Sequence, residues 1–295
     1  MFYLYIALTF LAYGLIQTLF MIGQKKGYVK SAVILSLYFI AAVLSIIGLA
    51  WQGQLSSDLF KESFFWVSVV IGLLISVSSI AGSYFMQIAF KKGPGSIAGS
   101  INALNAIIVI VVCLVFYNEF ATLVPRQIIG ASVAIIAAVL LRISDKEKSV
   151  KIQKFFWIFL IIAAASNGIT NALFKIGAAE GGEKMLISAV LYLGATALAI
   201  PILKKEISVN EPNPLLLRQS YIWGLIIGIC SFIGTISILK AFTLGPGTIV
   251  SAIVSVNVII LLMVTFIIYK EGKQLSRWQI IGIVIAIIAA FLMRF

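Results

Sequence analysis

The sequence predicts an all-α integral membrane protein, with ten transmembrane helices arranged as two inverted five-helix repeats around a central cavity. Composition is the first observation behind this prediction, because 62% of the residues are hydrophobic and only 11% are charged, whereas charged residues make up about a quarter of a soluble globular protein. Apolar runs of about 18 residues or more, each long enough to cross a bilayer as a helix, recur along the whole chain. The third observation is an internal duplication, which divides these runs into two equal sets.

The duplication is clearest between residues 89–142 and 241–294. With a constant shift of 152 positions (241 − 89) and no gap, about 25 of the 54 aligned positions are identical, and a repeat of this size sets the architecture of the whole chain. Apolar helices match each other by chance, so the shared glycines, prolines and asparagines are stronger evidence: Gly-Pro-Gly at 93–95 and 245–247, and Asn105 with Asn257. Residues 11–23 match 165–177 in the same way, so the duplication reaches the start of each half.

Ten spans follow from the apolar runs. Each is predicted to be a helix, since backbone groups in lipid must find hydrogen-bond partners within their own segment. Pro94 and Pro246 stand near the start of spans 4 and 9, where the first helical turn needs no N–H donor. The spans cover residues 2–23, 31–51, 64–90, 95–117 and 127–142 in the first half, and 155–177, 185–203, 221–243, 247–269 and 278–294 in the second.

Residues 143–154 form a polar linker between a first five-helix repeat, 1–142, and a second, 155–295. Five is an odd number, so the second repeat has to enter the membrane the opposite way round from the first. Inverted repeats are common in secondary transporters, whose substrate site lies at the repeat interface near the middle of the bilayer. The N-terminal run has no basic start and no cleavage site, and is expected to be the first membrane helix.

Several classes of function are excluded by composition. The chain contains no His, and its two Cys residues fall in apolar helices of different repeats, so neither a metal nor another cofactor is expected. A Gly-x-x-x-x-Gly-Lys phosphate loop is lacking, which argues against ATP as the energy source. The acidic residues lie in loops or at helix ends, so an enzyme is not expected. The net charge of +12 belongs to the loops and indicates contact with the lipid bilayer, not with nucleic acid.

The motifs resemble those of a known family. In each half an apolar helix leads to Tyr-x-Glu (117–119 and 269–271), a short loop, Gln-Ile-Ile-Gly (127–130 and 279–282) and a last Ala-rich helix. This pattern is similar to that of the EamA-type transporters of the drug/metabolite transporter superfamily. The resemblance implies a ten-helix basket with a cavity lined by spans 1, 3, 4, 6, 8 and 9, and with spans 5 and 10 as scaffold or as the contact of a homodimer. Small multidrug exporters of the superfamily use a carboxylate in the first helix, which spans 1 and 6 lack here.

Orientation is predicted from the basic residues. The loops that follow odd-numbered spans carry about 16 Lys and Arg, and the opposite side with both termini carries about 4, so the positive-inside rule places both termini outside. The family resemblance favours both termini in the cytoplasm, and we follow the charges. The expected location is the cell membrane, inner or plasma, with several passes.

Amides and hydroxyls are the polar groups in the middle of the predicted spans. Tyr13 and Gln17 are four positions apart and share one face of span 1; their repeat equivalents Asn167 and Asn171 have the same spacing in span 6. Buried amides can hold a polar or zwitterionic solute by hydrogen bonds. The predicted substrate-binding residues are Tyr13, Gln17, Tyr84, Asn102, Asn105, Asn167, Asn171, Lys240 and Asn257.

The alternative role for such amides is to join neighbouring helices. We expect Gln17, Asn102 and Asn171 to face the cavity, and both roles stay open for the duplicated pair Asn105 and Asn257. For Glu119 and its repeat equivalent Glu271, a helix-end turn or a salt bridge is expected.

Three further residues are predicted at the mouth of the cavity or as gating points: Gly14, Gly168 and Lys175. Gly14 and Gly168 are equivalent mid-span positions. Each glycine either provides a flexible point beside the cavity or allows two helices to pack closely, and close packing is favoured. Lys175 and Lys240 lie in the last turns of spans 6 and 8 on the lysine-poor side. Either they extend to the lipid headgroups, or they form a clamp for a carboxylate or phosphate.

The predicted function is secondary, ATP-independent transport of a small polar metabolite by alternating access, with an amino acid or related solute as substrate and export as the favoured direction. An exchanger of organic or phosphorylated anions that uses Lys175 and Lys240 is the alternative within the same class. A non-transporting membrane assembly protein, or an accessory of a lipid-carrier flippase, is the alternative of another class.

Overall fold

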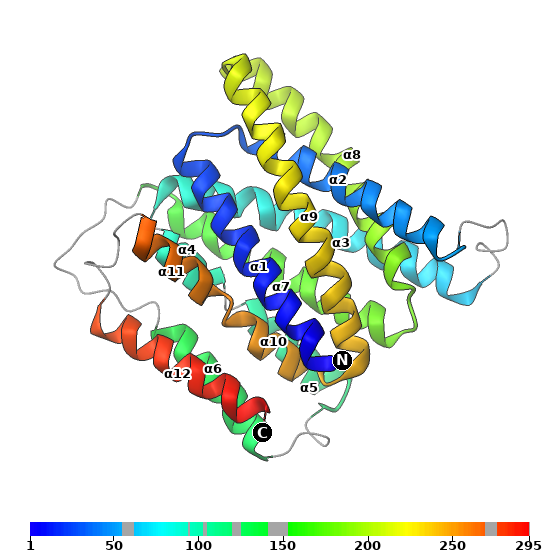
Figure 1. Ribbon diagram of the computed structural model, residues 1–295, viewed down its shortest axis with the longest axis vertical. Helices are drawn as coiled ribbons and strands as arrows, with labels where there is room; N and C mark the ends of the chain where they lie inside the picture. The colour runs from blue at the N-terminus through cyan, green and yellow to red at the C-terminus, as the bar shows by residue number, and fades with distance from the viewer. Residues whose placement is uncertain are drawn as a thin grey trace.

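The computed structural model describes residues 1–54, 62–93, 95–102, 105–119, 125–140, 153–268 and 276–294. Within these ranges the regular secondary structure is helical throughout (Figure 1). The first half contains α1 (Phe2–Lys25), α2 (Lys30–Trp51), α3 (Ser63–Lys92), α4 (Gly95–Asn102), α5 (Asn105–Phe116) and α6 (Pro125–Leu140). The second half contains α7 (Phe156–Ala179), α8 (Lys184–Asn210), α9 (Pro214–Leu244), α10 (Gly247–Ser255), α11 (Val258–Ile268) and α12 (Arg277–Arg294). Glu271 and most of the linker expected at 143–154 lie outside the described residues.

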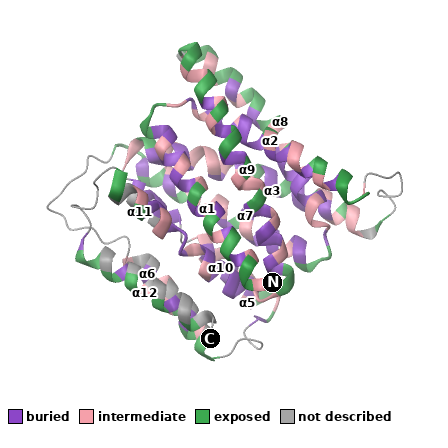
Figure 2. Ribbon diagram, viewed as in Figure 1, coloured by how far each residue is buried: buried purple, intermediate pink, exposed green. Residues whose placement is uncertain are grey.

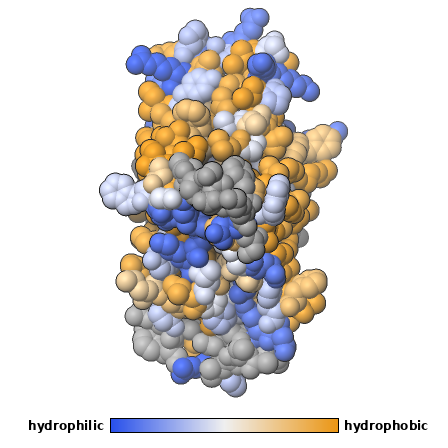
Figure 3. Space-filling view, turned by 90° about the vertical axis from the view of Figure 1, so that its right-hand side faces the viewer, coloured by the Kyte–Doolittle hydropathy of each residue, from blue (hydrophilic) through white to orange (hydrophobic). Residues whose placement is uncertain are grey.

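Seven spans among the described residues are long and apolar enough to cross a membrane: those of α1, α2, α3, α7, α8 and α9, and the segment 247–264. Many large apolar side chains point outward from these helices, and apolar side chains dominate the face drawn in Figure 3. A soluble protein rarely exposes such an extended apolar surface. The chain is therefore a multi-pass integral membrane protein. Among the described residues the predicted count of ten is not reached by this criterion, because the helices of predicted spans 4, 5 and 10 do not meet it. Of these, α4, α5 and α6 are too short.

Spans 4 and 9 were predicted as continuous helices, and for span 9 this prediction is wrong. Helices α10 and α11 are separated by Val256 and Asn257, and the Asn257 N–H bonds to the Val254 carbonyl, three residues back, at 3.0 Å. In the first half α4 ends at Asn102 and α5 begins at Asn105, the repeat equivalent of Asn257. Hydropathy did not reveal the break because one asparagine barely lowers the mean of an apolar run. Asparagine does compete locally for backbone hydrogen bonds, which disfavours a helix interior.

Helices α8 and α9 are longer than the predicted spans 185–203 and 221–243. The predictions ended where charged residues begin, but a helix that leaves the membrane keeps its internal hydrogen bonds. Thus α8 continues to Asn210. Helix α9 begins earlier, because Asn213 caps it: its side chain accepts the backbone N–H two residues further on at 2.9 Å, and Pro214 occupies the first turn.

The central bundle consists of α1, α2, α3, α7, α8 and α9, and Figure 2 shows buried residues running along these helices. Two glycines set the spacing between α2 and α9. A Cβ atom at Gly224 or Gly228 would collide with the backbone carbonyl of Val33 or Leu37 on α2, so the two helices pack with their backbones in close approach. Helices α6 and α12 pack mainly on each other, to one side of the bundle (Figure 1).

The helix contacts come in matched sets. Helix α1 packs on α9 as α7 packs on α3; α2 packs on α9 as α8 packs on α3; and α5 packs on α7 as α11 packs on α1. In each of these comparisons, the second contact is made by the helices that are equivalent, in the other half, to those of the first contact. The contacts α2–α8 and α6–α12 are each made between two equivalent helices. Equivalent helices of the two halves therefore have equivalent neighbours.

Candidate functional site

A cavity of about 120 Å³ lies between helices of both halves. Since one water needs about 10–15 Å³ by such a measure, the cavity holds a solute of roughly ten non-hydrogen atoms. Helices α1, α3, α4, α5, α7, α8, α9 and α10 contribute to its wall. The polar lining residues are Tyr13, Gln17, Ser79, Ser83, Asn102, Asn105, Asn167, Thr170, Asn171, Tyr192, Ser231, Thr235, Ser255 and Asn257.

Most of the predicted substrate-binding residues line this cavity, and four of them also join helices. The Asn167 side chain donates a hydrogen bond to the Asn102 side chain at 2.7 Å, which connects α7 to α4. The Gln17 side chain donates to that of Asn257 at 3.4 Å, which connects α1 to the break between α10 and α11. Each of these four side chains therefore both lines the cavity and joins two helices. Asn105 and Asn171 also line the cavity.

Helix α8 adds a tyrosine that the sequence analysis missed. The Tyr192 hydroxyl lies 2.7 Å from the Thr235 hydroxyl and 3.0 Å from the Ser231 hydroxyl, and all three residues line the cavity. The family resemblance implied a cavity lined by spans 1, 3, 4, 6, 8 and 9. Each of those spans contributes, and α8, which corresponds to span 7, contributes as well.

The first half contains an equivalent hydroxyl cluster. The Tyr38 hydroxyl lies 3.0 Å from that of Ser79 and 2.9 Å from that of Ser83, and the rings of Tyr38 and Tyr192 have centroids 6.1 Å apart. The shifts between the two clusters, 154 for the tyrosines and 152 for their partners, are those that relate the two halves. The repeat alignment therefore contained the signal, as polar residues at equivalent mid-span positions.

Two predicted substrate-binding residues lie outside the cavity. Tyr84 directly follows Ser83, and one residue turns a helix by about 100°, so its ring faces the Lys30 ammonium at 5.5 Å instead. Lys240 lies five residues beyond the cavity-lining position on α9, which turns it about 140° away from that face. Its ammonium lies 5.2 Å from the Tyr5 ring centroid. Neither side chain lines this cavity, and a role of Tyr84 or Lys240 in substrate binding stays a prediction.

Lys175 is held in an ion pair. Its ammonium lies 2.8 Å from the Glu119 carboxylate, and both side chains are more than nine-tenths buried. The same carboxylate accepts the backbone N–H groups of Gly247 and Thr248 at 2.8 and 2.9 Å and the Thr248 hydroxyl at 3.0 Å. A carboxylate at a helix N-terminus stabilises the unpaired N–H groups there. The salt bridge predicted for Glu119 is confirmed. Lys175, for which contact with headgroups and an anion clamp were both left open, uses its charge in this ion pair.

The surroundings of Glu119 hold it in the charged form. Burial acts to raise the pKa of this carboxyl, but the hydrogen bond from Lys175 and those from the Thr248 and Gly247 backbone outweigh it, so the pKa lies below the ordinary value of 4.5. Glu119 follows α5, Lys175 lies on α7 and Gly247 begins α10. One carboxylate thus connects three helices at this end of the bundle.

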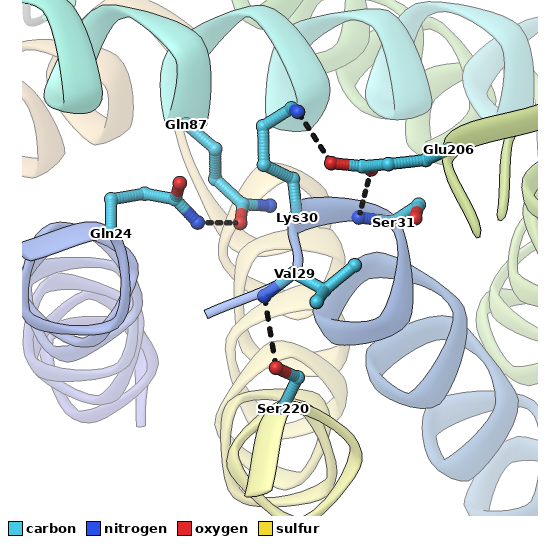
Figure 4. Close-up of polar contacts among 7 residues, drawn as sticks. All are labelled: Gln24, Val29, Lys30, Ser31, Gln87, Glu206 and Ser220. Atoms are coloured by element: carbon cyan, nitrogen blue, oxygen red, sulfur yellow. Dashed lines mark hydrogen bonds and ion pairs between the residues drawn. The ribbon is translucent and has the colours of Figure 1, made fainter. Parts of the chain in front are cut away.

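A second ion pair lies at the opposite end (Figure 4). The Lys30 ammonium is 2.7 Å from the Glu206 carboxylate, which also accepts the Ser31 backbone N–H at 3.1 Å. Nearby, the buried Gln24 side chain donates to Gln87 at 2.8 Å. Next to Lys30, the Val29 N–H donates a hydrogen bond to the Ser220 hydroxyl in the first turns of α9. In contrast, Glu119 accepts the N–H of Gly247, just after the last turn of α9. The two ion pairs therefore flank the cavity along the helix axes.

Gly14 and Gly168 do not line the cavity, and the structure favours the packing role. A Cβ atom at Gly14 would lie 2.9 Å from the Ile260 Cβ on α11, and one at Gly168 would lie 3.0 Å from the Ile108 Cβ on α5. Ile108 and Ile260 are themselves repeat equivalents. Gly14 thus allows α1 to contact α11, and Gly168 allows α7 to contact α5, the equivalent helix of the other half.

The fold and the site together define a multi-pass α-helical membrane protein with a cavity between its two halves, whose described lining residues are uncharged and include both polar and apolar side chains. Residues 155–295 match the model of the EamA-like transporter family, which confirms the resemblance given by the motifs and is consistent with a member of the drug/metabolite transporter superfamily. This suggests a transporter in general, and is compatible with a protein that is not an enzyme. None of the curated proteins matches the chain. A solved crystal structure of a protein matches with a TM-score of 0.70 over 98% of this chain and 96% of that chain, at 15% identity, which is a similarity of fold.

Proposed function

We propose that the protein is a secondary transporter that moves a small polar metabolite through the cavity by alternating access. The observation that carries this proposal is the cavity itself: it lies between the two halves and is lined by amides and hydroxyls at depths where polar groups are expensive unless they serve a function. The break at Val256 and Asn257, between α10 and α11, supports it, because discontinuous helices commonly form the substrate sites of transporters. An amino acid or related solute is the proposed substrate, and export the proposed direction.

The two halves act as inverted repeats of five spans each, 1–142 and 155–295, in which α4 with α5, and α10 with α11, each make up one span. The matched helix contacts support this arrangement. In such transporters one half rocks against the other around a fixed site.

The two ion pairs are suited to close the cavity in turn. Glu119 and Lys175 hold α5, α7 and α10 together at one end, and Lys30 and Glu206 hold α2 to α8 at the other. Each pair joins elements of both halves, so a rocking motion that opens one end must separate the groups there. Weakening one pair is then expected to favour the state that is open at that end.

Exchange of organic anions is less well supported. None of the described lining residues carries a charge, Lys175 is paired with Glu119, and Lys240 lies outside the lining. Burying an anion without a counter-charge costs several kcal/mol. If Lys240→Ala abolished anion transport by a normally folded protein, this alternative would replace our proposal.

Both termini are proposed to lie outside the cell membrane. The described Lys and Arg gather at the end with the Lys30–Glu206 pair, including Lys25, Lys26, Lys91 and Lys92, and this end is cytoplasmic under the positive-inside rule. A phosphatase fused after Phe295 should then be active outside the cytoplasm, and activity of a cytoplasmic reporter at that position would reverse the assignment. A homodimer formed through α6 and α12 is proposed from the family resemblance.

The function is tested by reconstitution. The purified protein is reconstituted into liposomes that contain an unlabelled amino acid. Uptake of the labelled amino acid from the outside, in exchange for the internal one, is then followed. Saturable exchange that is lost in Asn171→Leu, but kept in the control Ile47→Ala, is the expected result. Ile47 is 55% exposed on α2, which contributes no residue to the described lining of the cavity. Failure of the folded protein to exchange any small solute would contradict a transport function.

A further inference from the structure

Six helices of the central bundle form two sets of three. The first triad is α1, α2 and α9, and the second triad is α3, α7 and α8; in each, the helix from the other half packs on both of its partners, or both partners pack on it. Because α1, α2 and α9 are the repeat equivalents of α7, α8 and α3, each triad is the equivalent of the other. Each triad therefore combines two helices of one half with one helix of the other half.

In the first triad, α9 lies in close backbone contact with both partners. The glycines that bring it against α2 are Gly224 and Gly228, and a Cβ atom at Gly234 would lie 3.2 Å from the Ala12 Cβ on α1. Ser220 on α9 also accepts the backbone N–H just before α2 at 2.9 Å. Protein interiors packed to this density resist sliding, so these three helices are expected to move as one body.

The second triad repeats these contacts. A Cβ atom at Gly72 on α3 would lie 2.8 Å from the Val190 Cβ and 3.1 Å from the Ile187 carbonyl oxygen, both on α8. Ser68 on α3 accepts the backbone N–H of Glu183, just before α8, at 2.8 Å. A shift of 152 relates Gly72 and Ser68 to the α9 residues that contact α2 in the first triad (224 − 72 = 220 − 68 = 152). The molecule therefore contains two bodies of the same construction.

Polar side chains make hydrogen bonds between the triads. The Tyr38 hydroxyl on α2 contacts two hydroxyls on α3, and the Tyr192 hydroxyl on α8 contacts two on α9. Bonds of this kind can be exchanged for bonds to water when one end of the cavity opens, so their net cost is modest. Helices α2 and α8 also pack on each other. As equivalent helices they meet near the axis that relates the two halves, where a tilt between the triads displaces them least.

At the end of the molecule shown in Figure 4, an amide pair joins the two triads. The Gln24 side chain on α1 donates a hydrogen bond to that of Gln87 on α3 at 2.8 Å, and both residues are buried. Each lies four positions beyond a cavity-lining residue, Phe20 or Ser83, and so continues the lining face of its helix by one turn. The pair therefore lies between the cavity and this end of the molecule.

The amide pair is suited to opening. The Nε2 atom of Gln87 is buried and has no hydrogen-bond partner among the described residues. A buried donor without an acceptor is unfavourable, and separating the pair exposes this group to water. The repeat equivalents of Gln24 and Gln87 are Ala178 and Leu239 (24 + 154 = 178; 87 + 152 = 239), whose side chains cannot form a hydrogen bond. The amide pair is therefore a property of one end of the molecule and not of the repeat.

We infer that the two triads are the bodies that move against each other during transport, and that Gln24 and Gln87 form the latch between them at the end shown in Figure 4. This inference rests on the proposed transport function and deepens it. When this end opens, α1 moves away from α3, although both belong to the first half of the sequence. In contrast, α3 and α8 stay together, although they belong to different halves. Movement of the two sequence halves as bodies would do the opposite at both contacts.

The first test locks the latch with zinc. In Gln24→His/Gln87→His the two imidazoles replace amides whose bonded atoms are 2.8 Å apart, and two nitrogens on one tetrahedral zinc lie about 3.3 Å apart. The wild-type chain contains no His, so the wild type and the two single variants are the controls. In the liposome exchange assay, zinc should reduce exchange by the double variant about tenfold or more, because it binds the latched state alone. A chelator should restore the exchange.

The second test joins two helices within one triad. Ser76 on α3 and Gly194 on α8 lie outside the described lining of the cavity. A Cβ atom at Gly194 would be 3.0 Å from the Ser76 Cβ, and a disulfide needs about 3.5–4.5 Å, so a small shift admits the bond. Ser76→Cys/Gly194→Cys is made with both native cysteines replaced by alanine, and its melting temperature verifies folding. Oxidation should keep exchange within about twofold of the reduced protein, since a cross-link compatible with both states favours neither.

The outcomes separate this inference from the proposed function. Loss of exchange on oxidation would overturn the triads as moving bodies while transport stands, and it decides this point even if the histidine variant does not fold. Unchanged exchange by the histidine variant, with zinc binding shown by a raised melting temperature, would overturn the latch. Failure of the folded wild type to exchange any small solute would overturn both the inference and the proposed function.

Discussion

Replacing Glu119 by glutamine keeps the shape of the side chain and removes its charge, at a point where one carboxylate connects three helices. The wild-type carboxylate receives a hydrogen bond from Lys175, two from the backbone of Gly247 and Thr248, and one from the Thr248 hydroxyl, all within 3.0 Å. Glutamine can accept some of these bonds, but its NH₂ group opposes the donors that remain, and the Lys175 ammonium is left buried without a counter-charge.

The expected loss of stability is about 3 kcal/mol. Removing one partner of a buried ion pair costs about 3–5 kcal/mol, and the bonds that glutamine retains place this variant at the lower end. At about 2–4 °C per kcal/mol for chains of this order of size, the melting temperature should fall by about 6–12 °C. The effect should be local to this end of the bundle, because the Lys30–Glu206 pair is unchanged.

The assay is thermal unfolding of the purified protein in one detergent, for the wild type, Glu119→Gln, Lys175→Met and the double variant. Since removing both charges leaves no uncompensated ion, the double variant should be less destabilised than the sum of the single variants by about 2 kcal/mol or more. Strict additivity, or a melting temperature of Glu119→Gln equal to that of the wild type, would refute the reasoning that the pair is a single buried unit.

Three further predictions follow from the described contacts. Because the folded pKa of Glu119 is lowered, its contribution to stability is complete above about pH 4.5 and is lost as the pH falls through the folded value; melting curves across this range should show a decline that is smaller in Glu119→Gln. Tyr192→Phe removes a hydroxyl that forms hydrogen bonds with two partners, and should lower the free energy of unfolding by about 1–3 kcal/mol. Chemical or thermal unfolding measures this loss, and an unchanged midpoint would show that those bonds do not contribute to stability. Gly228→Ala places a Cβ against the α2 backbone and should reduce the folded yield, while Ile229→Ala on the outward-facing side should be tolerated; similar yields for both would argue against the close α2–α9 contact.

The break between α10 and α11 shows what the sequence alone did not predict. Asn105 and Asn257 were identified as a duplicated pair, but whether they faced a cavity or joined helices depended on the helix phase and on the neighbours across the bundle. The structure places Asn257 in a turn between two helices, where its side chain both lines the cavity and bonds to Gln17. Residues 240 positions apart decide that outcome, and no local pattern contains it.

The lysines make the same point about charge. Lys175 and Lys240 looked alike in the sequence, as basic residues in the last turn of apolar spans on the lysine-poor side. Only the packing of α7 against the ends of α5 and α10 brings Glu119 to Lys175, while Lys240 lies over an aromatic ring on α1. Positions that look equivalent in the sequence therefore differ in their contacts because their tertiary partners differ.

The sequence by itself determined that this is an all-helical membrane protein with a duplicated plan and mid-span amides, because hydropathy, repeats and helical periodicity are properties of single segments. Tertiary structure decided which amides meet, that Tyr38 and Tyr192 meet near the cavity, and that Lys175 pairs with Glu119. The physical reason is that a helix fixes only the angular position of its side chains, whereas cavities and ion pairs arise from the relative placement of several helices, set by contacts between residues far apart in the chain.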